Sequence, residues 1–138
     1  MKRLAAIVMA VFFTAAIAAH ACSCIERTLP QEVAETQAIF TGKVTKLEVV
    51  KVNDGVSVIE ATVVPERVFK GSVPKTVVFI TSDGCCYCAP WFDIAHDYLF
   101  YAILLNGKLQ TNACTRTKLL AKAKEEIQYL EQAAFTAE

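Results

Sequence analysis

Six cysteines and two histidines carry most of the chemistry that this 138-residue sequence could perform. The cysteines fall into three groups: Cys22 and Cys24, then Cys85, Cys86 and Cys88, and finally Cys114. Spacing alone does not choose among the many possible pairings. Since one residue separates Cys22 from Cys24 in a segment expected to be extended, their side chains should point to opposite sides and reach different partners.

Three uses of these cysteines compete. Structural disulfides would pin the N-terminus to the body of the protein. Redox catalysis is suggested by the C-x-x-C spacing of Cys85 and Cys88, but that chemistry needs the first thiol at a helix N-terminus, and Ala89-Pro90 follows instead. Metal binding with His96 would normally need a second paired cluster, which the sequence lacks. Structural disulfides are therefore favoured.

The sequence offers little for an enzyme. It contains no G-x-S-x-G, no H-E-x-x-H and no glycine-rich phosphate loop. His96 stands near Asp93 and Asp97, an arrangement that is common by chance. Basic and acidic side chains number 14 each, so nothing favours binding to nucleic-acid phosphates. We expect neither catalysis nor a cofactor.

The first residues predict export. Basic Lys2 and Arg3 precede an apolar run over residues 4–18, and small residues at Ala19 and Ala21 favour cleavage after Ala21. The alternatives are an uncleaved membrane anchor and a lipoprotein modified at Cys22, although Ala19 stands where lipoproteins usually have Leu. We therefore expect a signal peptide over 1–21 and a mature domain over 22–138, periplasmic or extracellular, in a compartment that favours disulfides.

Alternating and turn-forming residues predict five strands. Over residues 38–51 the apolar parity changes near Thr45 and Lys46, which indicates a bulge. Asn53-Asp54-Gly55 predicts a turn into a return strand over 56–69, where Pro65 marks an edge or a bulge. Further strands are expected over 76–81, 98–104 and 109–114, with an irregular loop over 83–97.

Two helices should flank these strands. Residues 29–36 predict a short helix, because Pro30 suits its first turn and the acidic side chains suit its positive end. Residues 117–135 carry an apolar stripe formed by Leu120, Ala123, Ile127, Leu130 and Ala134. The opposite face, with Lys118, Lys122, Glu125 and Glu126, is interpreted as solvated. Together the elements predict a mainly β domain: a five-stranded OB-type Greek-key barrel with a short N-terminal helix and a C-terminal amphipathic helix.

Several different short motifs lie along the mature chain. Their order and spacing together indicate a family more specifically than any single motif does. They are Cys22-Ser23-Cys24, residues 38–44, residues 68–71, Cys88 with Phe92 and Tyr98-Leu99, and residues 114–117. Together they resemble the tissue inhibitors of metalloproteinases, in particular the bacterial single-domain members. The resemblance implies a netrin-like module, which is an OB-type barrel and agrees with the strand count.

The resemblance also implies the disulfides Cys22–Cys88 and Cys24–Cys114. Cys85 and Cys86 have no counterpart in the family. They could pair with each other or stay reduced, and either could take the place of Cys88. The chain departs from the animal inhibitors further, because it lacks their third N-terminal disulfide, their second domain and their long extension between the first two strands.

The site that the resemblance implies lies at the mature N-terminus. The α-amine and carbonyl oxygen of Cys22 would chelate the catalytic zinc of a target metalloproteinase and displace its activated water. Ser23 would point toward the specificity pocket, and Cys24 and Ile25 would continue along the cleft. Tyr87 and Cys88 would lie beside this edge.

The leading hypothesis is thus a secreted, monomeric metalloproteinase inhibitor that holds no metal of its own. The alternative is a non-inhibitory exported netrin-like binding or structural module, whose activity would survive an extension of the N-terminus.

Overall fold

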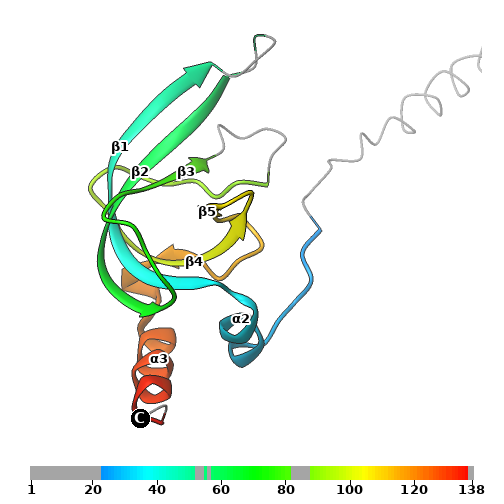
Figure 1. The fold of residues 1–138 in the computed structure, drawn as a ribbon, viewed down its shortest axis with the longest axis vertical. Helices are drawn as coiled ribbons and strands as arrows, with labels where there is room; N and C mark the ends of the chain where they lie inside the picture. The colour runs from blue at the N-terminus through cyan, green and yellow to red at the C-terminus, as the bar shows by residue number, and fades with distance from the viewer. Residues whose placement is uncertain (1–22, 52–54, 56, 82–87, 137–138) are drawn as a thin grey trace, which may run out of the picture.

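The computed structural model describes residues 23–51, 55, 57–81 and 88–136 (Figure 1). The elements are, in chain order, α2 (Leu29–Glu35), β1 (Ala38–Lys51), β2 (Ser57–Lys70), β3 (Val77–Thr81), β4 (Asp97–Leu105), β5 (Lys108–Gln110), β6 (Lys118–Leu119), the 3-10 helix η2 (Leu120–Lys122) and α3 (Lys124–Thr136). The prediction of a mainly β chain with two flanking α-helices is confirmed for these residues. The predicted signal peptide lies outside them.

All strand pairings are antiparallel. The order across the sheet is β3-β2-β1-β4-β5, and β6 also pairs with β4. β3 and β5, at the two ends of this order, lie next to each other. No ladder joins them within the described residues, so the sheet is strongly curved without being closed.

Bulges explain the curvature of β1 and β2, which bend sharply in Figure 1. The register shifts between Val44 and Lys46, at the position predicted from the change of apolar parity, and again between Thr41 and Gly42, opposite Pro65. Each extra residue increases the local twist of its strand. Gly42 permits the close approach, because a Cβ there would lie 2.8 Å from Val63 Cγ1.

The hairpin of β1 and β2 extends beyond the rest of the sheet. β1 pairs with β4 only as far as Lys43, whereas its pairing with β2 continues to Lys51. The outer part of the hairpin therefore extends beyond β4 as a ribbon, visible at the top of Figure 1. The strands themselves supply the length of this arm, and the predicted turn at Asn53-Asp54-Gly55 lies outside the described residues except for Gly55.

The sheet is buried on both faces around β1 and β4. The concave face holds an aromatic cluster of Phe40, Phe79, Phe92, Tyr98 and Phe100, in which Phe40 stacks on Phe100 with ring centroids 5.1 Å apart. The opposite face packs Ile39, Leu99 and Tyr101 against η2, α3 and α2. This double burial accounts for the nearly continuous apolar runs at 38–40 and 98–103, since neither face alternates with a solvated one.

Two predicted elements are wrong at the C-terminal end. The strand expected over 109–114 ends at Gln110, and the helix expected from residue 117 begins only at Lys124. Residues 118–119 pair with Tyr98 and Leu99 as β6, and a 3-10 turn then leads into α3. Pairing with β4 thus overrides the helical periodicity that residues 117–123 share with α3. The stripe itself is confirmed in part, because Leu120, Ala123, Ile127 and Leu130 pack beneath the sheet.

Two glycines with left-handed backbone offer a test of this packing. Gly71 (φ +79°) and Gly107 (φ +77°) share a conformation, but a Cβ at Gly71 would overlap the Gln37 carbonyl oxygen, whereas nothing lies within 4 Å of a Cβ at Gly107. We predict that Gly107→Ala costs about 1–2 kcal/mol of unfolding free energy, the cost of placing alanine in this conformation. Gly71→Ala should cost at least about 2 kcal/mol more. Urea denaturation of both variants measures this; equal losses would contradict the packing at Gly71.

Candidate functional site

The chain that pairs with β4 does so in two pieces, β5 and β6, and the residues between these two strands form the candidate site. Ile103 faces Gln110 across the β4–β5 ladder, so an unbroken ladder would place Cys114 opposite Leu99. Lys118 stands there instead, four residues farther along the chain. Residues 111–117 therefore leave the sheet as an excursion, called here the 111–117 turn, and Cys114 is carried out of the ladder.

Asn112 organises this turn. Its side-chain oxygen Oδ1 accepts hydrogen bonds from the backbone N–H groups of Cys114 (2.8 Å) and Thr115 (3.1 Å). Its backbone oxygen accepts a hydrogen bond from the Thr115 hydroxyl (3.0 Å). Such a side chain mimics a backbone turn, which explains why the strand stops where the Thr-Asn sequence begins.

Three threonine hydroxyls close the base of the turn. Thr111, Thr115 and Thr117 lie within 2.8–2.9 Å of one another through their Oγ1 atoms. Thr117 Oγ1 also accepts a hydrogen bond from the Tyr101 N–H (2.9 Å) and donates to the Tyr101 carbonyl (3.4 Å). The threonine thus replaces the backbone bonds that β4 loses where its partner strand departs.

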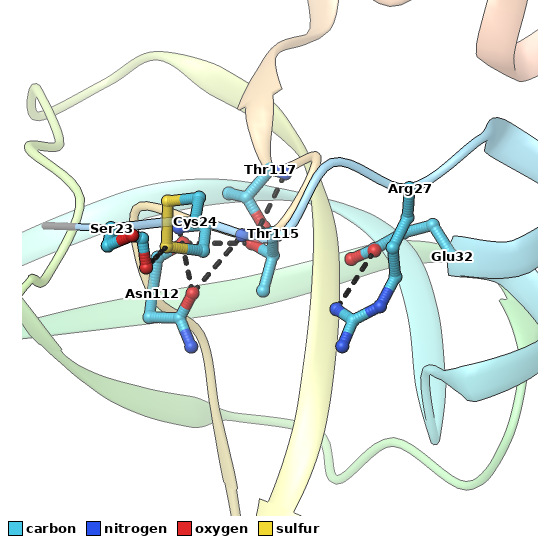
Figure 2. The surroundings of a disulfide bond; sticks show 8 residues. Ser23, Cys24, Arg27, Glu32, Asn112, Thr115 and Thr117 are labelled. Atoms are coloured by element: carbon cyan, nitrogen blue, oxygen red, sulfur yellow. Dashed lines mark hydrogen bonds and ion pairs between the residues drawn. A yellow bond between two sulfur atoms is a disulfide. The ribbon is translucent and has the colours of Figure 1, made fainter.

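The turn ties together three distant parts of the chain. Cys114 forms a disulfide with Cys24, with Cα atoms 5.2 Å apart, so the predicted Cys24–Cys114 pairing is confirmed (Figure 2). The Ala113 N–H donates to the Cys88 carbonyl at 2.6 Å. Cys88 has a left-handed backbone (φ +48°) and is disulfide-bonded. Its expected partner Cys22 lies outside the described residues, as do Cys85, Cys86 and Tyr87.

Ser23, Cys24 and Ile25 run extended across this turn, and together with Cys88 they form what we call the N-terminal edge. The Ser23 carbonyl oxygen lies 3.9 Å from Cys114 Sγ. Figure 2 shows the segment crossing the disulfide, with Asn112 and Thr115 of the 111–117 turn beside it. Ile25 is 76% exposed, so the edge presents an apolar side chain to solvent.

The same segment is fixed a second time at its C-terminal end. Arg27 Nε binds the Glu35 carboxylate at 2.8 Å, and its Nη1 lies 3.6 Å from the buried carboxylate of Glu32. Thr28 then caps α2 through a capping box with Gln31. Beneath the segment lies a hollow of about 300 Å³ between α2, the end of β4 and the 111–117 turn. The edge is therefore held at two points and open between them.

A buried ion cluster supports the far side of the turn, where the sequence predicted a solvated helix face. Glu126 is only 4% exposed, and its Oε1 accepts hydrogen bonds from Arg116 (3.0 Å) and Lys118. Burial, the largest influence, raises the pKa of Glu126, but these two hydrogen bonds outweigh it and the pKa is lowered overall. The interpretation of Glu126 as solvated is wrong, because the pairing of β6 with β4 places Lys118, and Arg116 just before it, against the Glu126 carboxylate.

Tyr101 lies between this cluster and α2. Its side chain is fully buried, and its hydroxyl has no hydrogen-bond partner within the described residues. Burial, followed by the repulsion of Glu126, raises the pKa of Tyr101 above its ordinary range. The tyrosine therefore remains neutral and serves as packing for the helices.

His96, the other candidate ligand, is exposed and takes part in a turn. Its Nδ1 lies 3.1 Å from the Ile94 carbonyl oxygen, and its own carbonyl accepts the Val44 N–H. Within the described ranges, no three His, Cys, Asp or Glu side chains gather closely enough to hold a metal ion. The same ranges contain no helix with the length and hydropathy needed to cross a membrane.

Sequence reasoning missed the residues that hold the site. Asn112 lay within the strand predicted over 109–114, and Thr115 and Thr117 followed it, but no holding role was predicted for them or for the pairing of Arg27 with α2. The signal available was the run of Thr and Asn side chains over residues 111–117, a composition typical of turns rather than strands.

Comparison with known proteins adds no identity: the sequence matches no protein-family model and no curated protein.

The Glu126 cluster predicts a pH dependence of stability. Because the pKa of Glu126 is lower in the folded than in the unfolded chain, the ionised carboxylate stabilises the fold above its ordinary pKa of about 4.3. This stabilisation is lost as the pH falls through the lowered folded value. Glu126→Gln should therefore flatten the decline of Tm between pH 5 and pH 3. Exposed Glu125→Gln is the matched control, and curves parallel to wild type for both variants would contradict the prediction.

Proposed function

We propose that this chain is an exported inhibitor of zinc metalloproteinases, acting through the N-terminal edge. The observation that carries the proposal is that Ser23, Cys24 and Ile25 lie exposed along a segment clamped by the Cys24–Cys114 disulfide, next to Cys88. An inhibitor that enters a protease cleft with its own N-terminus needs such an edge, because ordering a loose segment on binding would reduce affinity.

The finer fold assignment belongs to this proposal. An OB-type Greek-key barrel of the netrin-like kind has a five-stranded curved sheet whose outer strands meet. The order β3-β2-β1-β4-β5, the proximity of β3 to β5 and the bulged first strand all favour it. The resemblance of the motifs to the tissue inhibitors of metalloproteinases points the same way.

The proposed mechanism needs a mature chain that begins at Cys22. Its α-amine, with an ordinary pKa of about 7.7–8.0, loses its proton readily near neutral pH and then becomes a nitrogen ligand for zinc. The carbonyl oxygen of the same residue supplies a second donor. Together they would displace the water that the protease activates, which removes the nucleophile of hydrolysis.

The neighbouring residues would supply the rest of the contact. Ser23 is small and exposed, so it suits entry into a specificity pocket. Exposed Ile25 would place an apolar side chain along the cleft, and Cys88 would lie beside it, with Tyr87 preceding it in the chain.

The proposal predicts that inhibition depends on the residues at the very start of the mature chain. Ser23→Arg, or one additional alanine before Cys22, should weaken inhibition of a susceptible zinc metalloproteinase by about 100-fold or more. The arginine would force a charge into the pocket, and the alanine would move the amine away from the zinc. Inhibition constants measured across a panel of zinc metalloproteinases test this.

Ser72→Arg is the matched control, since Ser72 is an exposed serine in the connection from β2 to β3. It should leave the inhibition constant unchanged. If the extended protein inhibits as well as the mature one, the zinc-chelating mechanism is refuted. Absence of inhibition by the mature protein across the panel would instead favour a non-inhibitory exported binding module.

A further inference from the structure

The 111–117 turn is more elaborate than the pairing of β4 requires. A continuous strand from β5 to β6 would satisfy β4 through backbone hydrogen bonds alone. Instead, the chain leaves the ladder for four additional residues and replaces the lost bonds with side chains. None of residues 111–117 belongs to either hydrophobic cluster, and Thr111 is the only buried residue among them, so the excursion adds little apolar packing.

The excursion does serve the N-terminal edge. Ala113 binds Cys88 and Cys114 binds Cys24, so two consecutive residues hold the two halves of the edge. The orientation of these two residues is set by Asn112 Oδ1, which accepts the Cys114 and Thr115 N–H groups, and by the Thr115 hydroxyl, which returns to the Asn112 carbonyl. Figure 2 shows Asn112 and Thr115 directly beside the disulfide.

We infer that Asn112 and Thr115 are positioning residues for protease binding: they keep the turn rigid, and the turn holds Ser23–Ile25 and Cys88 as one preformed edge. This inference rests on the proposed function, because the edge matters for affinity only if it enters a protease cleft. Neither residue needs to touch the protease. Their effect reaches the edge through Cys114 and Ala113.

The inference predicts a specific pattern among four variants. Asn112→Ala and Thr115→Val remove the acceptor and the hydroxyl, whereas Asn112→Asp and Thr115→Ser retain them. The first pair should lower the backbone NMR order parameters of residues 23–25 in the free protein and speed hydrogen exchange at the amides of residues 114–115. It should also raise the dissociation rate of a protease complex about tenfold, with the association rate nearly unchanged. The second pair should behave like wild type.

Asn106→Gly provides a matched control, because it removes an asparagine side chain from a left-handed position (φ +50°) that glycine adopts freely. It should change neither the order parameters of residues 23–25 nor the dissociation rate. Rescue by Asn112→Asp separates a positioning role from general loss of stability, which Tm reports in parallel.

Each outcome decides a different point. Unchanged order parameters of residues 23–25 in both Asn112→Ala and Thr115→Val would overturn the inference, as would lowered order parameters with an unaltered dissociation rate. If the wild-type protein inhibits no metalloproteinase, the proposed function is refuted. Lowered order parameters in the two variants would then still support the positioning of the edge by these residues.

Discussion

The Cys24–Cys114 disulfide is the constraint on which the arrangement of the N-terminal segment depends. It joins residues 90 positions apart, and on the chain-entropy view closing a loop of this size destabilises the unfolded chain by about 4.6 kcal/mol. Its more specific effect is local. Among the described residues it is the one disulfide that links residues 23–26 to the chain beside the sheet, and the ion pairs of Arg27 tie the segment to α2. The bridge therefore holds this segment against the folded surface.

The disulfide can act this way because its other end is itself well supported. β4 lies between the aromatic cluster and the helices, and its residues 98–102 are buried on both faces. Thr117 attaches the 111–117 turn to Tyr101 in the middle of this strand. Beyond the turn, Glu126 of α3 holds Arg116 and Lys118. The core thus supports β4, β4 holds the turn, and the disulfide fixes the N-terminal edge to the turn.

Local sequence patterns predicted the paired strands β1 and β2 and the places where their register shifts. The bulge near Thr45 followed from a change of apolar parity, and the disturbance near Pro65 followed from the missing N–H of proline. The strand over 109–114 and the helix from residue 117 failed because both patterns are local, whereas the chain there is shaped by β4. Glu126 was misjudged for the same reason: its polar neighbours on the helix face solvent, but its ion partners come from β6 and the turn. The Cys24–Cys114 pairing came from the family resemblance, since spacing alone left it undetermined.

The proposed function requires the mature N-terminus to bind the catalytic zinc ion of a protease. The most direct measurement compares the affinity of the mature protein for one susceptible metalloproteinase with and without its catalytic zinc, by isothermal titration calorimetry on folded enzyme. Chelation by the Cys22 amine and carbonyl requires the metal, so binding to the zinc-free enzyme should be weaker by about two orders of magnitude or more. Equal affinity for both forms would contradict the claim, because the edge would then bind the protease without using the metal.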